Sequence, residues 1–315
     1  MVLLITGLGL VGSQAAALAV SQGERPVVYE LNPQVETLGG IVDPKKFELV
    51  RGDMLNREQF ERDISPLGVD RIIHTVANPM LTIGAQSNPI DAIRLNIMGT
   101  ANVLETARKL GISKVVLCSS SVLYTDRTGG VESGKFQEDN YPRPTTIYAT
   151  TKLACENLGI NYAESYGLKF VALRFRAVFG PWVGRGGGGG PTSIFRKLLE
   201  ASLAGEEVTV PSKYLEFVYS KDAAKATIIA AYSEASLKTR IYNVSMGKTY
   251  SWNEIAILVA QRIPSAKIVV SEQEEKISKP EPIDLTRSRD ELGFEPSYDM
   301  PHAIDDYISF YKIKS

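Results

Sequence analysis

A glycine-rich turn directly follows the first hydrophobic run of the chain. Residues 2–5 are apolar and partly β-branched without alternation, which is typical of a strand buried on both faces of a parallel sheet. Gly7, Gly9 and Gly12 then form the pattern G-x-G-x-x-G, and residues 13–22 are expected to be helical. The first glycine permits a tight turn, the second lets the backbone approach a pyrophosphate, and the third lets helix and strand pack closely. A dinucleotide would place its phosphates at the helix N-terminus, where free N–H groups and the helix dipole favour negative charge.

An acidic residue follows this turn at an informative distance. A second strand is expected at residues 26–29, and it ends in Glu30, 18 residues beyond Gly12. That spacing is close to the one expected for the acidic residue that binds the adenosine ribose. A carboxylate there accepts hydrogen bonds from the 2′- and 3′-hydroxyls and repels a 2′-phosphate. Leu31 and Asn32 offer no arginine for such a phosphate, so the sequence predicts NAD rather than NADP as the cofactor.

The overall composition argues against several classes of protein. A net charge of −1 gives no electrostatic basis for binding nucleic acid or an anionic membrane. No apolar run approaches the roughly 20 residues that span a bilayer, and the N-terminus enters the first strand directly, so no signal peptide is expected. Cys118 and Cys155 are expected to be buried, reduced thiols, and the two histidines form no metal-ligand spacing with them. We expect a cytoplasmic protein that binds a small molecule and no metal.

Strands and helices alternate through the first half of the chain. Further strands are expected at 47–50, 71–74, 114–118 and 168–175, with helices at 89–110 and 147–166. Repeated β–helix–β units of this kind predict an α/β fold with a doubly wound parallel sheet, a Rossmann fold. After Pro181 the pattern becomes irregular, with helices expected at 192–204, 222–232 and 252–262 and strands near 208 and 217. We therefore expect a dinucleotide-binding Rossmann domain over residues 1–180. Residues 181–315 are expected to form a smaller C-terminal substrate-binding lobe, with some elements returning to the sheet.

Tyr148 and Lys152 lie one helical turn apart and share a helix face. An ammonium beside a phenol favours the phenolate. Such a tyrosine can remove a proton from a secondary alcohol while a hydride leaves for a nicotinamide. Ser120 lies at the carboxyl end of the preceding strand, the end at which open α/β sheets bind ligands, and is placed to hydrogen-bond the same oxygen. Ser120, Tyr148 and Lys152 are the expected catalytic residues.

Several motifs together resemble the extended short-chain dehydrogenase/reductase family, in particular its NAD-dependent epimerase/dehydratase group. They are the turn at 6–12, Gly52-Asp53, Asn96 to Thr100, the run from Ser120 to Tyr124, the Tyr148/Lys152 pair, and segments 173–181 and 290–294. The resemblance extends over nearly the whole chain and supports the catalytic assignment. Together with the turn and Glu30, it implies cofactor contacts from Gly7, Gly9, Leu10, Val11, Gly12, Glu30, Asp53, Met54, Thr75, Val76, Ala77, Asn96, Ser119, Tyr148 and Lys152.

Four positions depart from the pattern of this group. Ser121 and Val122 stand where dehydratases of the group carry Asp-Glu, so 4,6-dehydration of a nucleotide sugar is not expected. Ala177 and Leu215 stand where relatives carry an asparagine and an arginine that hold the substrate phosphates. These departures favour a smaller substrate, such as a free sugar, a sugar acid or a lactone. A glycine run at 186–190 is expected to form a mobile substrate loop, and the candidate substrate residues are Ser121, Arg176, Arg185 and Arg287.

The resemblance implies an NAD-dependent enzyme of carbohydrate metabolism that acts on a secondary hydroxyl of a sugar or sugar derivative. In the leading hypothesis, epimerisation, a hydride goes to NAD, the keto intermediate turns, and the hydride returns to the other face. Three alternatives stay open: a net dehydrogenase of a sugar, sugar acid or small hydroxy compound, a nucleotide-sugar 4-epimerase, and a non-catalytic dinucleotide-sensing protein. Helices 89–110 and 147–166 carry small and apolar residues on more than one face. Relatives pair these helices across a two-fold axis, so a homodimer is expected.

Overall fold

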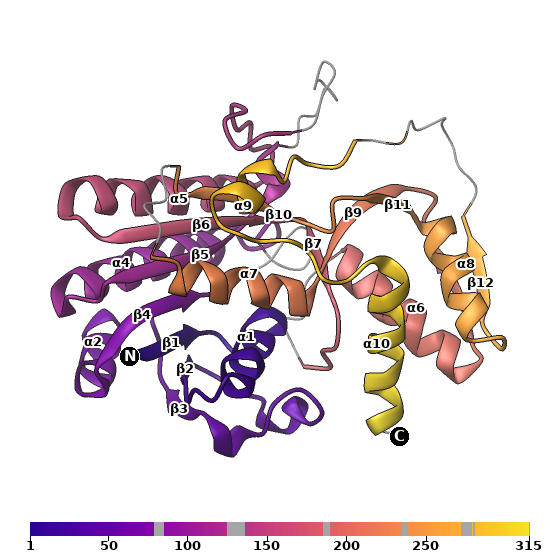
Figure 1. Cartoon of the computed structure of the whole chain (residues 1–315), viewed down its shortest axis with the longest axis horizontal. Coiled ribbons are helices and arrows are strands. Elements are labelled where there is room, and N and C mark those ends of the chain that lie inside the picture. Colours follow the sequence, from indigo (N-terminus) through magenta and orange to yellow (C-terminus); the bar gives the residue numbers. More distant parts are fainter. Residues whose placement is uncertain are drawn as a thin grey trace.

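A seven-stranded parallel sheet organises the molecule (Figure 1). The computed structural model describes residues 1–78, 85–124, 136–184, 190–234, 239–271, 279 and 281–314. Within them, the strands lie in the order β10 (Ile241–Val244), β6 (Lys169–Phe175), β5 (Lys114–Ser120), β4 (Val69–His74), β1 (Val2–Thr6), β2 (Val27–Glu30) and β3 (Glu48–Arg51). Every neighbouring pair is parallel. The chain winds outward in both directions from β1, so the predicted doubly wound sheet is confirmed, and its ligand crevice is expected where β1 and β4 diverge.

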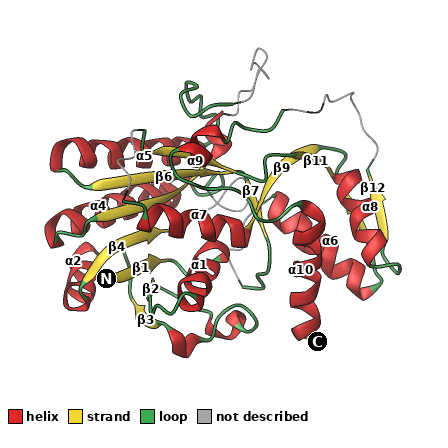
Figure 2. Cartoon of the chain, viewed as in Figure 1, coloured by secondary structure: helices red, strands yellow, loops and turns green. Residues whose placement is uncertain are grey.

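Helices cover both faces of this sheet (Figure 2). α1 (Leu10–Ser21) and α7 (Ser220–Tyr232) pack on one face, where their buried alanines allow close contact with the strands. α2 (Arg57–Ile64), α4 (Gly99–Leu110) and α5 (Ile147–Tyr166) pack on the other face. The helix expected at 89–110 is helical throughout, but it consists of α3 (Pro89–Ile93), a π-helical turn at Arg94–Met98, and α4.

The second part of the chain forms a lobe with its own core. Its helices are α6 (Pro191–Ala204), α8 (Trp252–Arg262) and α10 (Met300–Lys314). One small sheet contains β7 (Ala177–Phe179), β9 (Tyr214–Tyr219) and β11 (Thr249–Ser251), and another contains β8 (Glu207–Val210) and β12 (Lys267–Val270). Aromatic rings fill the core between them, with the rings of Phe179 and Phe195 only 4.2 Å apart. Because β10 and α7 return to the main sheet and α9 (Thr286–Asp290) contacts β10, the chain links lobe and sheet several times.

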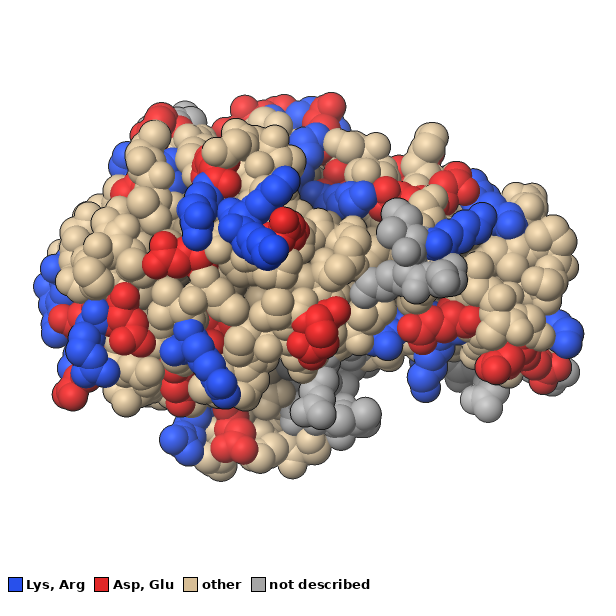
Figure 3. Space-filling model, turned by 90° about the horizontal axis from the view of Figure 1, so that it is seen from below, with Lys and Arg blue, Asp and Glu red and all other residues tan. Residues whose placement is uncertain are grey.

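Acidic and basic side chains are mixed over the face that Figure 3 presents, in keeping with the net charge of −1. Among the described residues, no helix combines the length and the apolar character needed to cross a membrane. Cys118 and Cys155 are buried and unbridged, as expected from the sequence, and burial raises the pKa of the Cys118 thiol to about 12. The described part of the chain contains no group of side chains suited to hold a metal ion.

Candidate active site

The glycine turn between β1 and α1 has the geometry of a phosphate cradle. Gly7 has a φ of +92°, and a Cβ on Gly12 would lie 2.0 Å from the Gly7 carbonyl oxygen, so neither position tolerates a side chain. Thr75 fixes the turn from β4, because its hydroxyl donates to the Thr6 carbonyl oxygen at 2.8 Å. The helix ladder begins with the Ser13 N–H, which donates to Gly9. The N–H groups of Leu10, Val11 and Gly12, in the first turn of α1, have no acceptor within the helix and can bind an anion, so the turn fits a dinucleotide pyrophosphate.

Glu30 is held over this turn at the end of β2. Its Oε2 accepts a hydrogen bond from the Leu8 N–H at 2.9 Å, and its Oε1 accepts one from the Asn32 N–H at 3.0 Å. These bonds fix the carboxylate at the edge of the cleft where a dinucleotide ribose would lie. Arg51 pairs with Glu30 in the register of β2 and β3, and its Nε donates to the Leu31 carbonyl oxygen at 3.2 Å. The sequence analysis missed this arginine, because only the strand register brings it beside the acid.

Asn96 connects the strand ends with the catalytic helix. It lies in the π-helical turn and is only 1% exposed. Its Oδ1 accepts from the Asn78 N–H at 2.7 Å, and its Nδ2 donates to the Thr151 hydroxyl at 2.8 Å. Asn96 therefore ties the loop after β4 to α5. The structure gives it the position of a supporting residue rather than one that lines the cleft.

Tyr148, Lys152 and Ser120 come together in one cleft. Thr146 caps α5 by accepting the Ala149 N–H at 3.1 Å, which places Tyr148 in the first helical turn. Lys152 lies one turn later and is 3% exposed; its Nζ donates to the Cys118 carbonyl oxygen at 2.7 Å and lies 5.6 Å from the centre of the Tyr148 ring. Ser120 ends β5, two residues beyond that carbonyl. The expected serine, tyrosine and lysine therefore converge from a strand end and a helix start.

A buried ionic network supports this cluster from behind. Glu156, one turn beyond Lys152, pairs with Arg174 of β6 at 2.8 Å, and the two side chains are 1% and 2% exposed. The Ser119 hydroxyl donates to the same carboxylate at 2.6 Å. The sequence analysis did not single out Glu156, although its spacing from Tyr148 and Lys152 repeats the helical turn. The network fixes α5 against the ends of β5 and β6.

His74, at the end of β4, is a packing residue in this structure. Its ring nitrogens contact the hydroxyls of Thr6 at 2.7 Å and Thr100 at 3.1 Å, and it is 1% exposed. Burial, with a smaller contribution from the charge of Lys152, lowers the pKa of His74 to about 3. The ring is therefore neutral across the physiological pH range.

The cleft has a volume of about 1210 Å³, more than the roughly 300–1000 Å³ typical of a site for one small ligand. It has room for a cofactor and a substrate together. Its described lining includes these expected residues: Gly7, Gly9, Leu10, Val11, Glu30, Thr75, Val76, Ala77, Ser119, Ser120, Ser121, Tyr148, Lys152 and Arg176. Gly12 lies beneath the turn, and Asp53 and Met54 follow β3 without joining the described lining.

The three candidate arginines differ in position. Arg176 lines the cleft. Arg287 instead pairs with Asp139, and its Nε lies 3.9 Å from the Glu138 carboxylate. The structure therefore does not bring Arg287 to the described cleft lining. Arg185 and most of the glycine run, with the loops at 79–84 and 125–135, lie outside the described residues.

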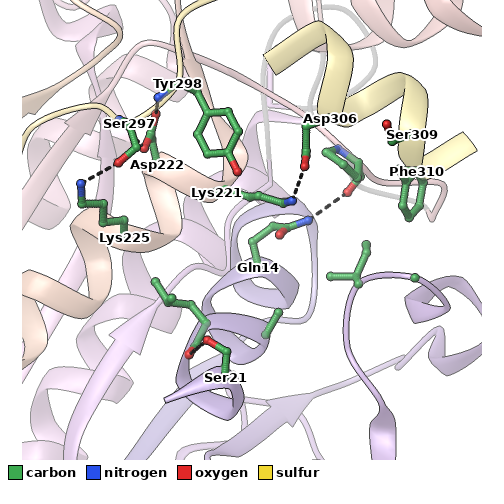
Figure 4. Close-up of a pocket in the computed structure, with 15 residues that line it drawn as sticks. Gln14, Ser21, Lys221, Asp222, Lys225, Ser297, Tyr298, Asp306, Ser309 and Phe310 are labelled. Atoms are coloured by element: carbon green, nitrogen blue, oxygen red, sulfur yellow. Dashed lines mark hydrogen bonds and ion pairs between the residues drawn. The ribbon is translucent and has the colours of Figure 1, made fainter. Parts of the chain in front are cut away.

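A second hollow, of about 630 Å³, lies between α1, α7 and α10 (Figure 4). Its charged groups are bound within the protein: Lys221 pairs with Asp306 at 2.7 Å, and Lys225 donates to the Ser297 hydroxyl at 2.7 Å. The Asp222 carboxylate accepts the backbone N–H groups of Ser297 and Tyr298. This hollow is therefore a seam between elements, and the chemistry lies in the larger cleft.

The family model described as "NAD dependent epimerase/dehydratase family" matches residues 3–245. Together with the sheet order, the glycine cradle and the tyrosine–lysine pair, this match defines the class of protein as the extended short-chain dehydrogenases/reductases. The chain belongs to the NAD-dependent epimerase/dehydratase family and is an enzyme whose cofactor is NAD.

Relatives of different activity resemble this chain to a similar degree. A dTDP-glucose 4,6-dehydratase of Streptomyces griseus is 26% identical over 98% of this chain and 93% of its own length. A UDP-glucose 4-epimerase of Lacticaseibacillus casei is 26% identical over 93% and 91%. The structure of a UDP-glucose 4-epimerase with UDP-glucose from Thermotoga maritima superposes with a TM-score of 0.85 at 22% identity, covering 100% and 99% of the two chains. This last likeness confirms the fold.

Proposed function

We propose that this enzyme epimerises a secondary hydroxyl of a sugar or sugar derivative, with NAD as a tightly held cofactor. The observation that carries the proposal is the convergence of Ser120, Tyr148 and Lys152 in a cleft that the glycine cradle and Glu30 also line. The cradle fits the pyrophosphate and Glu30 fits the ribose diol, so NAD would extend along the cleft toward the tyrosine.

Each catalytic side chain has a distinct task in this proposal. The Tyr148 oxygen takes the hydroxyl proton of the substrate, and Ser120 holds the same oxygen by a hydrogen bond. Lys152 stabilises negative charge on the Tyr148 oxygen and is itself held by the Cys118 carbonyl oxygen. When bound, NAD would supply a reversible acceptor for the hydride of the substrate carbon. For epimerisation, Tyr148 then returns the proton after the ketone has presented its other face.

The residues after Ser120 argue against dehydration, whereas the cleft is compatible with more than one class of substrate. Ser121 and Val122 follow Ser120 with no acid/base pair of the kind that dehydration needs, so the proposal does not include dehydration. A net dehydrogenase would use the same three residues but release the ketone and NADH. The volume of the cleft is compatible with a nucleotide sugar as well as a smaller sugar.

The test is product analysis of the NAD-loaded enzyme with a panel of free sugars, sugar acids and UDP- or TDP-sugars, performed in D₂O. The proposal predicts an epimer that retains protium at the inverted carbon, with no net rise in absorbance at 340 nm. A stoichiometric rise in NADH would favour the dehydrogenase. Deuterium at the inverted carbon would contradict hydride transfer, and no conversion across the panel would favour the dinucleotide-sensing alternative.

We also propose that the chain forms a homodimer through residues 89–98, the helical segment made of α3 and the π turn, which packs beside α5. Ile90, Ile93 and Met98 are 66%, 38% and 53% exposed, an unusual concentration of large apolar side chains on a short segment. A second copy related by a two-fold axis would cover them with the same surface.

A further inference from the structure

Arg176 lines the cleft close to the end of β5, which carries Ser120. It follows β6 directly, and the preceding Phe175 is the register partner of Ser120 on β5. Its backbone N–H donates to Val244, which anchors the residue where β6 and β10 end. The side chain is 19% exposed and lines the cleft. The guanidinium is therefore carried by rigid strand ends, one residue away from the position that neighbours the catalytic serine.

Glu216 fixes the orientation of this guanidinium. Its Oε2 accepts the Arg176 Nε at 2.8 Å and the Ile283 N–H at 3.0 Å, and its Oε1 accepts the Ser245 hydroxyl. Glu216 borders the cleft but is 2% exposed, and both of its carboxylate oxygens already accept hydrogen bonds from the protein. Among the described residues, the two terminal nitrogens of Arg176 meet no acceptor. One edge of the guanidinium is thus held in the protein, and the other presents a planar pair of donors.

The surroundings favour a single negative charge on that open edge. Ala177 and Leu215, which flank Arg176 in the cleft, are apolar and contribute no charge to a second anionic group. The other described cations of the lining are Lys152 and Arg51, and each donates to a backbone carbonyl oxygen elsewhere. The buried Glu216 carboxylate also repels an anion bound to the same guanidinium, and it repels a diphosphate more strongly than a monoanion.

We propose that Arg176 is the specificity-determining residue that binds a carboxylate of the substrate, so that the enzyme acts on a sugar acid. A carboxylate matches the two parallel donors of a guanidinium and carries one charge. Glu216 is the positioning residue that aims this guanidinium. The inference rests on the proposed function, because it concerns the substrate of the same cleft.

The test compares ligands that differ only in the carboxylate. Calorimetry on the NAD-loaded enzyme would measure D-glucuronate against D-glucose, and UDP-glucuronate against UDP-glucose. We expect the acid to bind at least about tenfold more tightly in one or both pairs, as a charge-assisted bidentate contact implies. Arg176→Gln should abolish this preference, Arg176→Lys should restore part of it, and Glu216→Gln should reduce it. Arg287→Gln is the matched control, an arginine outside the described cleft lining that should leave the preference unchanged.

Several results would overturn the proposal. Equal binding of acid and neutral sugar in both pairs, or no binding of either acid, would exclude a carboxylate site. If Arg176→Gln weakens UDP and UDP-glucose as much as UDP-glucuronate, the residue binds phosphate instead. Thermal melts of each variant would show that the fold is retained. Since binding needs no turnover, an acid preference in an enzyme without epimerase activity would refute the proposed function and leave the carboxylate site standing.

Discussion

Replacing Glu156 by alanine should be among the most destabilising single substitutions in this chain. The carboxylate pairs with Arg174 at 2.8 Å, accepts the Ser119 hydroxyl at 2.6 Å, and the two charged side chains are at most 2% exposed. Removing one partner leaves the Arg174 charge buried and uncompensated, which typically costs about 3–5 kcal/mol. At about 2.1 cal/mol/K per residue, the unfolding entropy of 315 residues is about 660 cal/mol/K, so the melting temperature should fall by roughly 5–8 °C.

The assay is thermal and urea unfolding at neutral pH, with a double variant and a surface control. Glu156→Leu combined with Arg174→Met removes both charges and should recover much of the lost stability, since the penalty comes from the unpaired charge. Glu234→Gln is the control: Glu234 pairs with Lys169 at 3.5 Å with both side chains more than half exposed, so the change should be below about 1 kcal/mol. A Glu156→Ala variant as stable as the Glu234→Gln control would refute the reasoning.

Three further predictions concern the cofactor, pH and assembly. Glu30→Ala should weaken NAD binding by about 1–3 kcal/mol, the usual loss for hydrogen bonds to a charged group; titrations of NAD and NADP check this, and a wild-type preference for NADP would contradict it. Because the pKa of His74 is lowered to about 3, the unfolded chain binds a proton below about pH 6.5 that the folded protein does not. The free energy of unfolding should therefore fall as the pH falls through this window, by up to roughly 1.4 kcal/mol per pH unit from this group. Measured by urea unfolding between pH 6.5 and 5, the dependence of this free energy on pH should be shallower in His74→Asn than in the wild type. The same dependence in both proteins would contradict the role of His74. Light scattering should show a dimer at micromolar concentration that Met98→Glu shifts toward monomer, and a monomeric wild type would overturn the proposed assembly.

Local patterns were sufficient to predict the frame of the site. The buried run, the glycines and Glu30 specify a strand, a turn and a second strand within about 30 residues, and local sequence sets all three. The 20-residue helix with Tyr148 and Lys152 was likewise predicted, and it spans Ile147–Tyr166 as expected. Such elements can be predicted from the sequence because the residues that specify them lie close together along the chain.

What the sequence could not supply is the set of contacts made across the fold. Glu216 meets Arg176 only because β7 and β9 pair in one register, in which Ala177 lies opposite Phe217. Arg51 reaches the edge of the cleft through the pairing of β2 with β3. Arg287 was expected in the cleft but pairs with Asp139, a residue 148 positions away. Such partners depend on strand order and register, which no local pattern encodes.

The most direct test of the central claim compares the wild-type enzyme with Tyr148→Phe on the substrate that the panel identifies. Turnover by product analysis and NAD affinity by titration should be measured on the same preparations. The account predicts a loss of turnover of about 10²-fold or more, the scale for a positioned acid or base, with NAD affinity little changed. A Tyr148→Phe enzyme that turns over at a rate close to the wild type would contradict it.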